Sequence, residues 1–194
     1  APYELGYDPS LKPYPYDQNK ARQLLKDAGY GPGDLKLTLD FPLGQIPNSK
    51  DVAEAIAAMW EAVGVKVTLK ATEWGAYFSN LNSGNPGTKD EVFMMYGNQP
   101  GADSSEGMQP YFVKGASWNW TGYDNPEISA LILKAGTNVD PKVREPIYQD
   151  LAARLHDEAA WGFLYMWVNL YGVRQGLTLT PRPDAQVMAY DYLK

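Results

Sequence analysis

Cysteine is absent from the 194-residue sequence, and histidine occurs only once. The first absence excludes disulfides, zinc–thiolate sites and thiol catalysis, but it fits a reducing compartment and a secreted protein equally well. No apolar run approaches the roughly 18 residues that a membrane-spanning helix needs. The 17 basic residues form no cluster and are outnumbered by 23 acidic ones, giving a net charge of −6. We therefore expect neither nucleic acid nor an anionic membrane surface as a partner.

Signals for catalysis are also scarce. The lone histidine, His156, lies late in an amphipathic stretch, the usual setting of a helical histidine near the carboxyl end. The segment GASWN lacks the second glycine of a G-x-S-x-G nucleophile elbow. Methionines 94, 95 and 108 with His156 would make an unusually soft metal site, and core packing explains the first two. We expect no enzyme, no cofactor and no metal site.

One catalytic alternative stays open. Glycoside hydrolysis needs two carboxylates roughly 5 to 9 Å apart, and aromatic rings would hold the sugar. Four acidic residues are available for such a pair: Glu73, Asp103, Glu106 and Asp124. Any acidic protein offers such pairs by chance, and a sequence does not give their separation. A carboxylate-pair glycoside hydrolase therefore ranks behind a binding function.

Aromatic residues are abundant. The 6 Trp, 14 Tyr and 5 Phe make up 13% of the chain, more than a core of this size has to use. We therefore expect some rings to face a ligand. Trp74 stands out, because EWGAYFSNLNSG places it in the first turn of a helix directly after an alternating strand.

Helix and strand patterns alternate along the first half of the chain. DQNKARQLLKDAGY has apolar residues at three- and four-residue spacing with Asp17 as a cap, and LKLTLDF alternates as a half-buried strand does. A second pair follows, with a helix face from Val52 to Val63 and the alternating VKVTLK. The short helix EWGAYFSNLNSG and the apolar strand EVFMMY come next. This order predicts an α/β fold with a mixed sheet flanked by helices.

The second half begins with an irregular stretch. Residues 97–110 (GNQPGADSSEGMQP) show no period and predict a long loop, a feature that usually has a function. NPEISALILKAG and DPKVREPIYQDLAARLHDEAA each predict a helix with an Asn or Asp cap before proline. WGFLYMWVNLYGVRQGLTLT is almost wholly apolar from Trp161 to Val173 and predicts one or two strands, one of them central.

The order of these segments resembles that of a known family. YDQNKARQLLKDAGY, VAEAIAAMWEAVGVKVTLKATEWGAYFSNLNSG, YDNPEISALILKA and DEAAWGFLY follow one another as in the C-terminal part of family 5 extracellular solute-binding proteins. These are the oligopeptide, dipeptide and nickel receptors of bacterial ABC importers. The resemblance covers nearly the whole chain and implies a periplasmic-binding-protein-like (type II) lobe.

The same resemblance implies a two-lobed receptor that closes over its ligand. Residues 1–165 would form the second lobe, incomplete at its N-terminus, and residues 166–194 would cross back toward the first lobe. The chain begins at Ala1 with APYELGYDP, so we expect it to be excised from a longer protein with a signal peptide or lipoprotein anchor. That protein would be an extracytoplasmic monomer that delivers its solute to a membrane permease.

Binding residues also follow from the resemblance. Trp74 matches a position whose ring faces the cleft in peptide receptors, and Tyr96 stands where many members have tryptophan. Asp103 matches the acidic residue that pairs with the α-ammonium group of a peptide ligand. The loop before Asp103 carries extra residues (GNQPG), so the alignment can also place Glu106 there. The remaining candidates around this loop are Asn98, Gln99, Trp118 and Trp120.

Two ligand classes stay open. The frequency of peptide receptors within this family favours an oligopeptide as the ligand. At Leu81 and around Met94, however, some peptide receptors have arginines that hold the ligand carboxylate, and this sequence has no basic residue there. Abundant Trp, Tyr, Asn and Gln would suit an oligosaccharide, because sugar faces stack on rings and hydroxyls pair with amides. The two classes rank nearly level, with peptide first.

Overall fold

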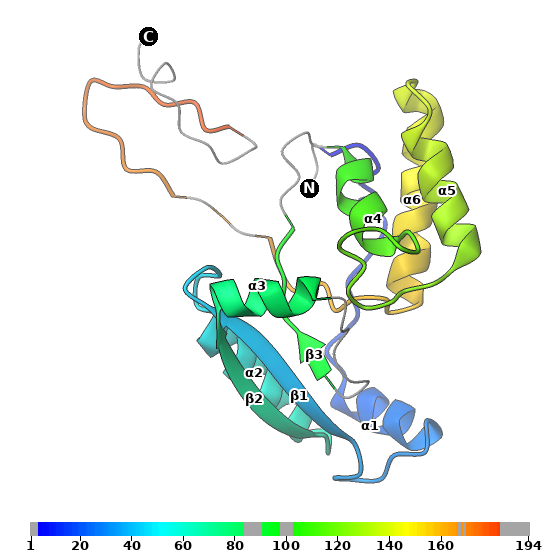
Figure 1. Cartoon of the computed structure of the whole chain (residues 1–194), viewed down its shortest axis with the longest axis vertical. Coiled ribbons are helices and arrows are strands. Elements are labelled where there is room, and N and C mark those ends of the chain that lie inside the picture. Colours follow the sequence, from blue (N-terminus) through cyan, green and yellow to red (C-terminus); the bar gives the residue numbers. More distant parts are fainter. Residues whose placement is uncertain (1–3, 84–90, 98–102, 167, 169, 183–194) are drawn as a thin grey trace. The chain divides into compact units, whose positions relative to one another are not determined.

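The computed structural model describes residues 4–83, 91–97, 103–166, 168 and 170–182 (Figure 1). The chain divides into two compact units, which are treated separately below. The sheet unit comprises residues 13–96 and 120–122. The helical unit comprises residues 1–12, 97–119 and 123–194. The predicted site residues Asn98 and Gln99 lie outside the described residues.

The sheet unit contains three strands that all run parallel. They are β1 (Lys36–Leu43), β2 (Lys66–Glu73) and β3 (Glu91–Phe93), in the spatial order β2-β1-β3. Leu39 of β1 is level with Leu69 of β2 on one side and with Val92 of β3 on the other. Three helices belong to the same unit: α1 (Gln18–Asp27), α2 (Ser49–Glu61) and α3 (Trp74–Asn82).

Alternation along β1 explains how the two faces of the sheet differ. Leu39 and Phe41 point to the face that α2 covers, where they form a core with Ala53 and Met94. Asp40 points to the other face and is nearly buried, at 9% exposure. Its carboxylate accepts a hydrogen bond from the Thr72 hydroxyl and pairs with the Lys70 ammonium 2.7 Å away. The hydrogen bond from Lys70 to Asp40 raises the pKa of Lys70 above its usual value.

The helical unit packs three helices around an apolar core. They are α4 (Ser104–Phe112), α5 (Pro126–Gly136) and α6 (Pro141–Asp157). Asn125 and Asp140 cap the last two, each directly before a proline at the first helical position. The core of this unit is made of buried residues from all three helices: Tyr111, Phe112, Ile128, Ile132, Ala135, Tyr148, Leu151 and Leu155.

An extended segment at the start of the chain is fastened to α4 and α6. Leu5 pairs with Asp103 in a short parallel bridge, and the Leu5 carbonyl accepts a hydrogen bond from the Ser104 hydroxyl. Further along, the Gln149 amide donates to the Tyr7 carbonyl over 3.1 Å. Gly6, between these contacts, is buried against Tyr148.

The α/β fold class predicted from the sequence is confirmed, and the three described strands show only parallel pairing. The predicted loop 97–110 is wrong in its second part, because Asp103 caps a helix that begins at Ser104. Pro110, Gly107 and the serines at positions 104 and 105 hid this helix from a periodicity search.

The prediction of one or two strands between Trp161 and Val173 is also wrong. The described residues of this stretch form neither helix nor strand, and several large apolar side chains are exposed there, with Leu170 at 92%. An apolar sequence becomes a strand only when a neighbouring strand satisfies its backbone groups, and none of the described strands does so. Among the described residues, no helix is long and apolar enough to span a membrane.

Candidate functional site

The carboxyl ends of the three parallel strands meet at one edge of the sheet. Gln45 follows β1, Trp74 follows β2 as the first residue of α3, and Tyr96 follows β3. Figure 1 shows α3 running across this edge. Ligands of open α/β sheets bind outside the carboxyl ends of the strands. This edge is therefore the candidate site of the sheet unit.

Aromatic rings form a connected cluster at this edge. Trp74 stacks on Phe78 with ring centroids 5.4 Å apart, and it meets Tyr96 at 5.9 Å. Phe78 continues the cluster to Trp120 in an edge-to-face contact of 5.9 Å. The Trp120 indole is 8% exposed and donates a hydrogen bond to Asn82. Trp120 is thus part of the packed base of the cluster, whereas Trp74 and Tyr96 are half-buried at its surface.

The first turn of α3 is held at the edge by two anchors. Glu73 caps the helix by accepting hydrogen bonds from the backbone of Gly75 and Ala76. Tyr77, at 2% exposure, donates its hydroxyl to the Met94 carbonyl over 2.7 Å. Burial, with a smaller effect of nearby Asp40, raises the pKa of Tyr77 far above its ordinary value, so the hydroxyl stays protonated as a donor.

Tyr77→Phe is expected to lower the free energy of unfolding of the sheet unit by about 1–2 kcal/mol, because a buried carbonyl loses its donor. Denaturant unfolding would measure the loss. Exposed Tyr30 supplies the control, because Tyr30→Phe removes a hydroxyl at the surface and should change stability by less than about 0.5 kcal/mol. Equal effects of the two substitutions would show that the Tyr77 hydroxyl does not anchor α3.

Gln45 is a member of this site that the sequence did not reveal. Its side-chain amide donates a hydrogen bond to the Tyr96 hydroxyl over 2.9 Å, and its side chain is exposed. Alternation in LKLTLDF gave the strand but not its pairing with EVFMMY, so nothing placed Gln45 beside Tyr96. A polar residue two positions after a strand of a parallel sheet was the available signal.

Asp103 belongs to the helical unit, where it caps α4. Its Oδ1 atom accepts hydrogen bonds from the Ser105 backbone at 2.9 Å and from Arg144 Nη2 at 2.7 Å. Arg144 also donates to the Tyr148 hydroxyl and to the Ala135 carbonyl. Burial acts against ionisation of Asp103, but the hydrogen bonds from Arg144 and Ser105 outweigh it, and the pKa lies below its ordinary value.

Trp118 lies in a different part of the helical unit, beside a hollow of about 520 Å³. The hollow is lined by Ser105, Glu106, Gln109, Pro110, Ala116, Ser117 and Trp118. Trp118 is 40% exposed, and its ring meets the buried Tyr111 ring at 5.6 Å. Glu106, the alternative to Asp103 in the alignment, is part of this lining, whereas Asp103 is not.

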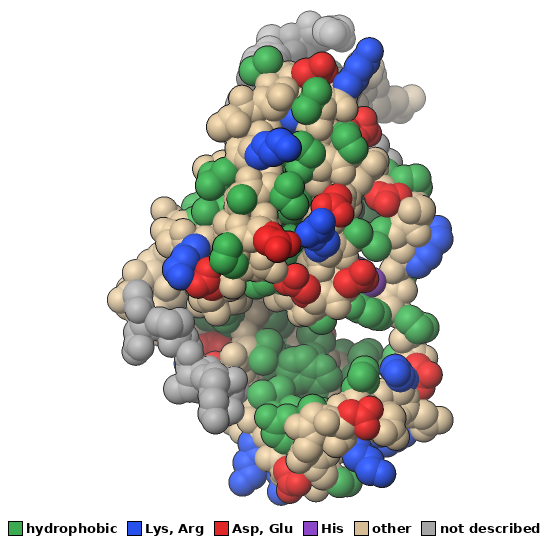
Figure 2. Space-filling model, turned by 90° about the vertical axis from the view of Figure 1, so that its right-hand side faces the viewer, with side chains coloured by type: hydrophobic (Ala, Val, Ile, Leu, Met, Phe, Trp, Pro, Cys, Tyr) green, Lys and Arg blue, Asp and Glu red, His purple; other side chains and the backbone are tan. Residues whose placement is uncertain are grey.

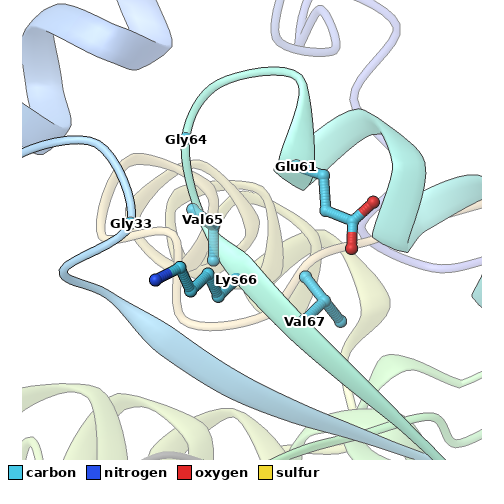
Figure 3. A pocket seen from close by; sticks show the side chains of 6 residues that line it. All are labelled: Gly33, Glu61, Gly64, Val65, Lys66 and Val67. Carbon is cyan, nitrogen blue, oxygen red and sulfur yellow. The ribbon is translucent and has the colours of Figure 1, made fainter.

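A second hollow, of about 420 Å³, lies at the opposite edge of the sheet, where β2 begins. It is lined by Gly33, Glu61, Gly64, Val65, Lys66 and Val67 (Figure 3). The Lys66 side chain extends toward Gly33, while the Glu61 carboxylate lies on the other side of the hollow (Figure 3). None of the predicted site residues lines it.

Three of the four acidic residues considered for glycoside hydrolysis have a structural role. Glu73 caps α3, Asp103 caps α4, and Asp124 pairs with Lys114 at 2.5 Å. In the part of the chain that the structure describes, no group of three or more His, Asp or Glu could hold a metal ion. On the face shown in Figure 2, basic and acidic side chains are interspersed.

The structure therefore brings together part of the predicted set. Trp74 and Tyr96 meet at the carboxyl edge of the sheet, and Trp120 joins them through Phe78. Asp103 and Trp118 occupy separate places in the helical unit.

A small parallel sheet flanked by helices is the fold of a lobe of a type II periplasmic binding protein. Residues 1–121 match the family described as bacterial extracellular solute-binding proteins, family 5 (middle region). The chain belongs to this family.

Its relatives are named for the ligands they bind. The chain is 28% identical over 190 residues to di/tripeptide-binding protein 4 of Pseudomonas aeruginosa. The aligned region covers 93% of this chain and 34% of that protein. It is 29% identical over 165 residues to the dipeptide-binding protein of Escherichia coli K12. This second alignment covers 81% of this chain and 30% of that protein. The chain thus spans about a third of the length of these relatives.

Solved structures agree with these relatives. The periplasmic binding protein DppA of Helicobacter pylori, in complex with the peptide STSA, has a TM-score of 0.66 and 29% identity, over 82% of this chain and 30% of that chain. The murein tripeptide binding protein MppA of Escherichia coli has a TM-score of 0.66 and 28% identity, over 80% of this chain and 31% of that one. The family and these relatives are binding proteins, which confirms the prediction of a solute-binding, non-catalytic class.

Proposed function

We propose that this chain is the second lobe of the substrate-binding component of an ABC importer, which captures an oligopeptide between two lobes and delivers it to a membrane permease. The observation that carries the proposal is the aromatic cluster of Trp74, Phe78 and Tyr96 at the carboxyl edge of a parallel sheet, in a family 5 chain. The relatives named above bind dipeptides, tripeptides or murein peptide. The receptor would act as an extracytoplasmic monomer.

Each candidate residue, taken within its own unit, has a role in this proposal. The rings of Trp74 and Tyr96 supply flat apolar contact for peptide side chains, and Gln45 orients the Tyr96 hydroxyl. Asp103 supplies a carboxylate for the α-ammonium group: Oδ1 holds Ser105 and Arg144, and the ligand would approach Oδ2. Asn98, Gln99 and Trp118 complete the candidate set. Closure follows because contacts from both lobes stabilise the closed state over the open one.

Residues 166–194 would cross back toward the first lobe and pack against it. The apolar side chains of this segment that the structure describes support this proposal, since Val168 is 83% exposed and Leu170 is 92% exposed. Large apolar side chains exposed near one another in the sequence are typical of a surface that meets another part of a protein. Residues 1–165 would then form the lobe itself.

An oligosaccharide is the second candidate ligand. Met94, where some peptide receptors have a basic residue nearby, is 7% exposed and packs in the core of the sheet unit, so it offers no contact to a ligand carboxylate. The exposed surfaces of the rings and the Gln45 amide would suit stacked sugar faces and hydroxyl groups.

Calorimetric titration of the whole receptor, refolded to remove bound ligand, distinguishes the two classes. We expect heat with pooled oligopeptides, and a loss of at least about tenfold in affinity in Trp74→Leu. Trp60→Leu, in α2 and outside the site, is the matched control and should bind as the parent does. Asp103→Asn should weaken peptides that have a free amino terminus and leave acetylated peptides unchanged.

If pooled oligosaccharides gave a heat of binding that persisted in Asp103→Asn and disappeared in Trp74→Leu, the receptor would be an oligosaccharide receptor. Binding of neither pool, or turnover of a peptide or glycoside that is lost in Glu73→Gln, would contradict the proposal.

A further inference from the structure

The hollow where β2 begins has fixed walls, all of them within the sheet unit. Two turns meet there, because the Gly33 backbone donates a hydrogen bond of 2.7 Å to the Gly64 carbonyl. The Val65 backbone donates to the Trp60 carbonyl over 3.1 Å, which ties the start of β2 to the last turn of α2. Walls fixed in this way lose little conformational freedom when a ligand binds.

Two opposite charges lie on opposite sides of this hollow. Figure 3 shows the Lys66 side chain extending toward Gly33, with the Glu61 carboxylate on the other side. The Lys66 stem rests on the bare backbone of Gly33, since a Cβ atom added there would lie 3.0 Å from Lys66 Cε. Within the described part of the chain, neither Glu61 nor Lys66 has an ion-pair partner. The hollow therefore offers an ammonium and a carboxylate that can each pair with a ligand charge.

The neighbouring charges favour a carboxylate at the Lys66 end. Lys36 is level with Lys66 in the register of β1 and β2, so both side chains point to the same face of the sheet. Lys36 likewise has no carboxylate partner among the residues that the structure describes. Asp34, two residues before Lys36, already accepts a hydrogen bond from the Gly31 backbone over 2.9 Å. Two neighbouring ammonium groups repel each other, and an anion bound beside them relieves that repulsion.

Between the two charges the lining is apolar. Val65 is 6% exposed and Val67 is half-buried, and Gly64 adds only backbone. A volume of about 420 Å³ lies within the range of small-ligand pockets, about 300–1,000 Å³. An alkyl chain matches this lining, because it buries apolar surface and leaves no polar group of its own unpaired.

We propose that this hollow is a second binding site of the protein, separate from the aromatic edge, and that it takes a linear ω-amino acid. The ligand carboxylate pairs with Lys66, its ammonium group pairs with Glu61, and its methylene chain lies on Val65 and Val67. An α-amino acid fits less well, because it carries both charges on one carbon whereas Lys66 and Glu61 lie on opposite sides of the hollow. A ligand with a single charge leaves one of the two protein charges without a partner.

Titration of the chain with 5-aminopentanoate, followed by ¹H–¹⁵N NMR of the backbone amides, tests this site. We expect saturable shifts of the Gly33, Gly64 and Val67 signals, which fade as ionic strength rises. The Trp74 indole signal, at the opposite edge of the sheet, should not move. Shifts confined to Trp74, or no saturable shift at all, would overturn the proposal.

Variants of the two charged residues test the pairing. Glu61→Gln and Lys66→Gln should each weaken binding by roughly threefold to fivefold, the effect of losing one exposed ion pair. Glu54→Gln and Lys20→Gln remove the same charges at exposed positions outside the hollow and should leave binding unchanged. If Glu61→Gln and Lys66→Gln bound the ligand like these controls, the two charges would not hold it.

Three smaller changes to the ligand test its chemistry without altering the protein. Pentanoate lacks the ammonium group, pentylammonium lacks the carboxylate, and glycine keeps both charges on one carbon. Each should bind at least about threefold more weakly than 5-aminopentanoate, because it leaves one protein charge unpaired. The proposal is wrong if any of the three binds as tightly as 5-aminopentanoate.

Discussion

Gly6→Ala is expected to destabilise the helical unit by about 2–5 kcal/mol. Gly6 has a φ of +93°, a backbone region that costs an L-residue about 1–2 kcal/mol. A Cβ atom added there would lie 2.4 Å from Tyr148 Cβ, much closer than van der Waals contact. Tyr148 is fully buried on α6 and cannot move aside, so overpacking adds about 1–3 kcal/mol.

Gly29→Ala separates these two causes. Gly29 has a similar φ of +88°, but nothing lies within 4 Å of an added Cβ, so only the backbone cost remains. Hydrogen exchange localises the effect: protection should fall for α6 amides in Gly6→Ala and stay unchanged for β1 amides. If Gly6→Ala cost no more than Gly29→Ala, the starting segment would not be packed against α6 as described.

Patterns that repeat within one element could be predicted from the sequence. Alternation gave β1, where Leu39 and Phe41 are buried in the core, and β2, where Val67 packs against the same core. Asn125 and Asp140 marked helix starts because a cap and a following proline act locally. The ring of Trp74 was placed correctly at the end of a strand for the same reason.

Features that depend on distant partners could not be predicted. Asp103, the cap of α4, is bonded by Arg144, which lies 41 residues away in the sequence. Gln45 reaches Tyr96 across 51 residues, and only the pairing order β2-β1-β3 makes them neighbours. The strand prediction for the apolar stretch after Trp161 was wrong for a related reason. Its composition is typical of a strand, but its backbone pairs with none of the described strands.

Asp103 shows how a candidate binding residue can also be structural. The family resemblance predicts that its carboxylate binds a ligand, and the structure shows that it caps α4 and pairs with Arg144. Any loss of binding in an Asp103 variant therefore needs a separate measurement of stability. An Arg144 variant offers that measurement, because Arg144 bonds Oδ1 whereas the proposed ligand approaches Oδ2.

Arg144→Leu is expected to lower the free energy of unfolding by about 2–4 kcal/mol. The guanidinium side chain is 12% exposed, and it bonds Asp103, the Tyr148 hydroxyl and the Ala135 carbonyl at 2.7, 2.9 and 3.0 Å. Its removal leaves a half-buried carboxylate without its cation, which costs more than the loss of a surface pair. Arg154→Leu is the control on the same helix: its side chain is 44% exposed and pairs with Asp150, so the loss should stay within about 1 kcal/mol.

The double variant Asp103→Asn/Arg144→Leu should recover part of this loss, because no unpaired charge remains. The pH dependence follows from the Asp103 pKa, which lies below its ordinary value of about 3.9 in the folded state. The stabilisation from the pair is therefore complete above the unfolded-state pKa and is lost as pH falls through the lower folded-state pKa. Denaturant unfolding from pH 7 down to pH 2 would show the parent losing this increment and Asp103→Asn lacking it. A parent and variant with parallel pH profiles would mean that the Arg144 pair contributes nothing to stability.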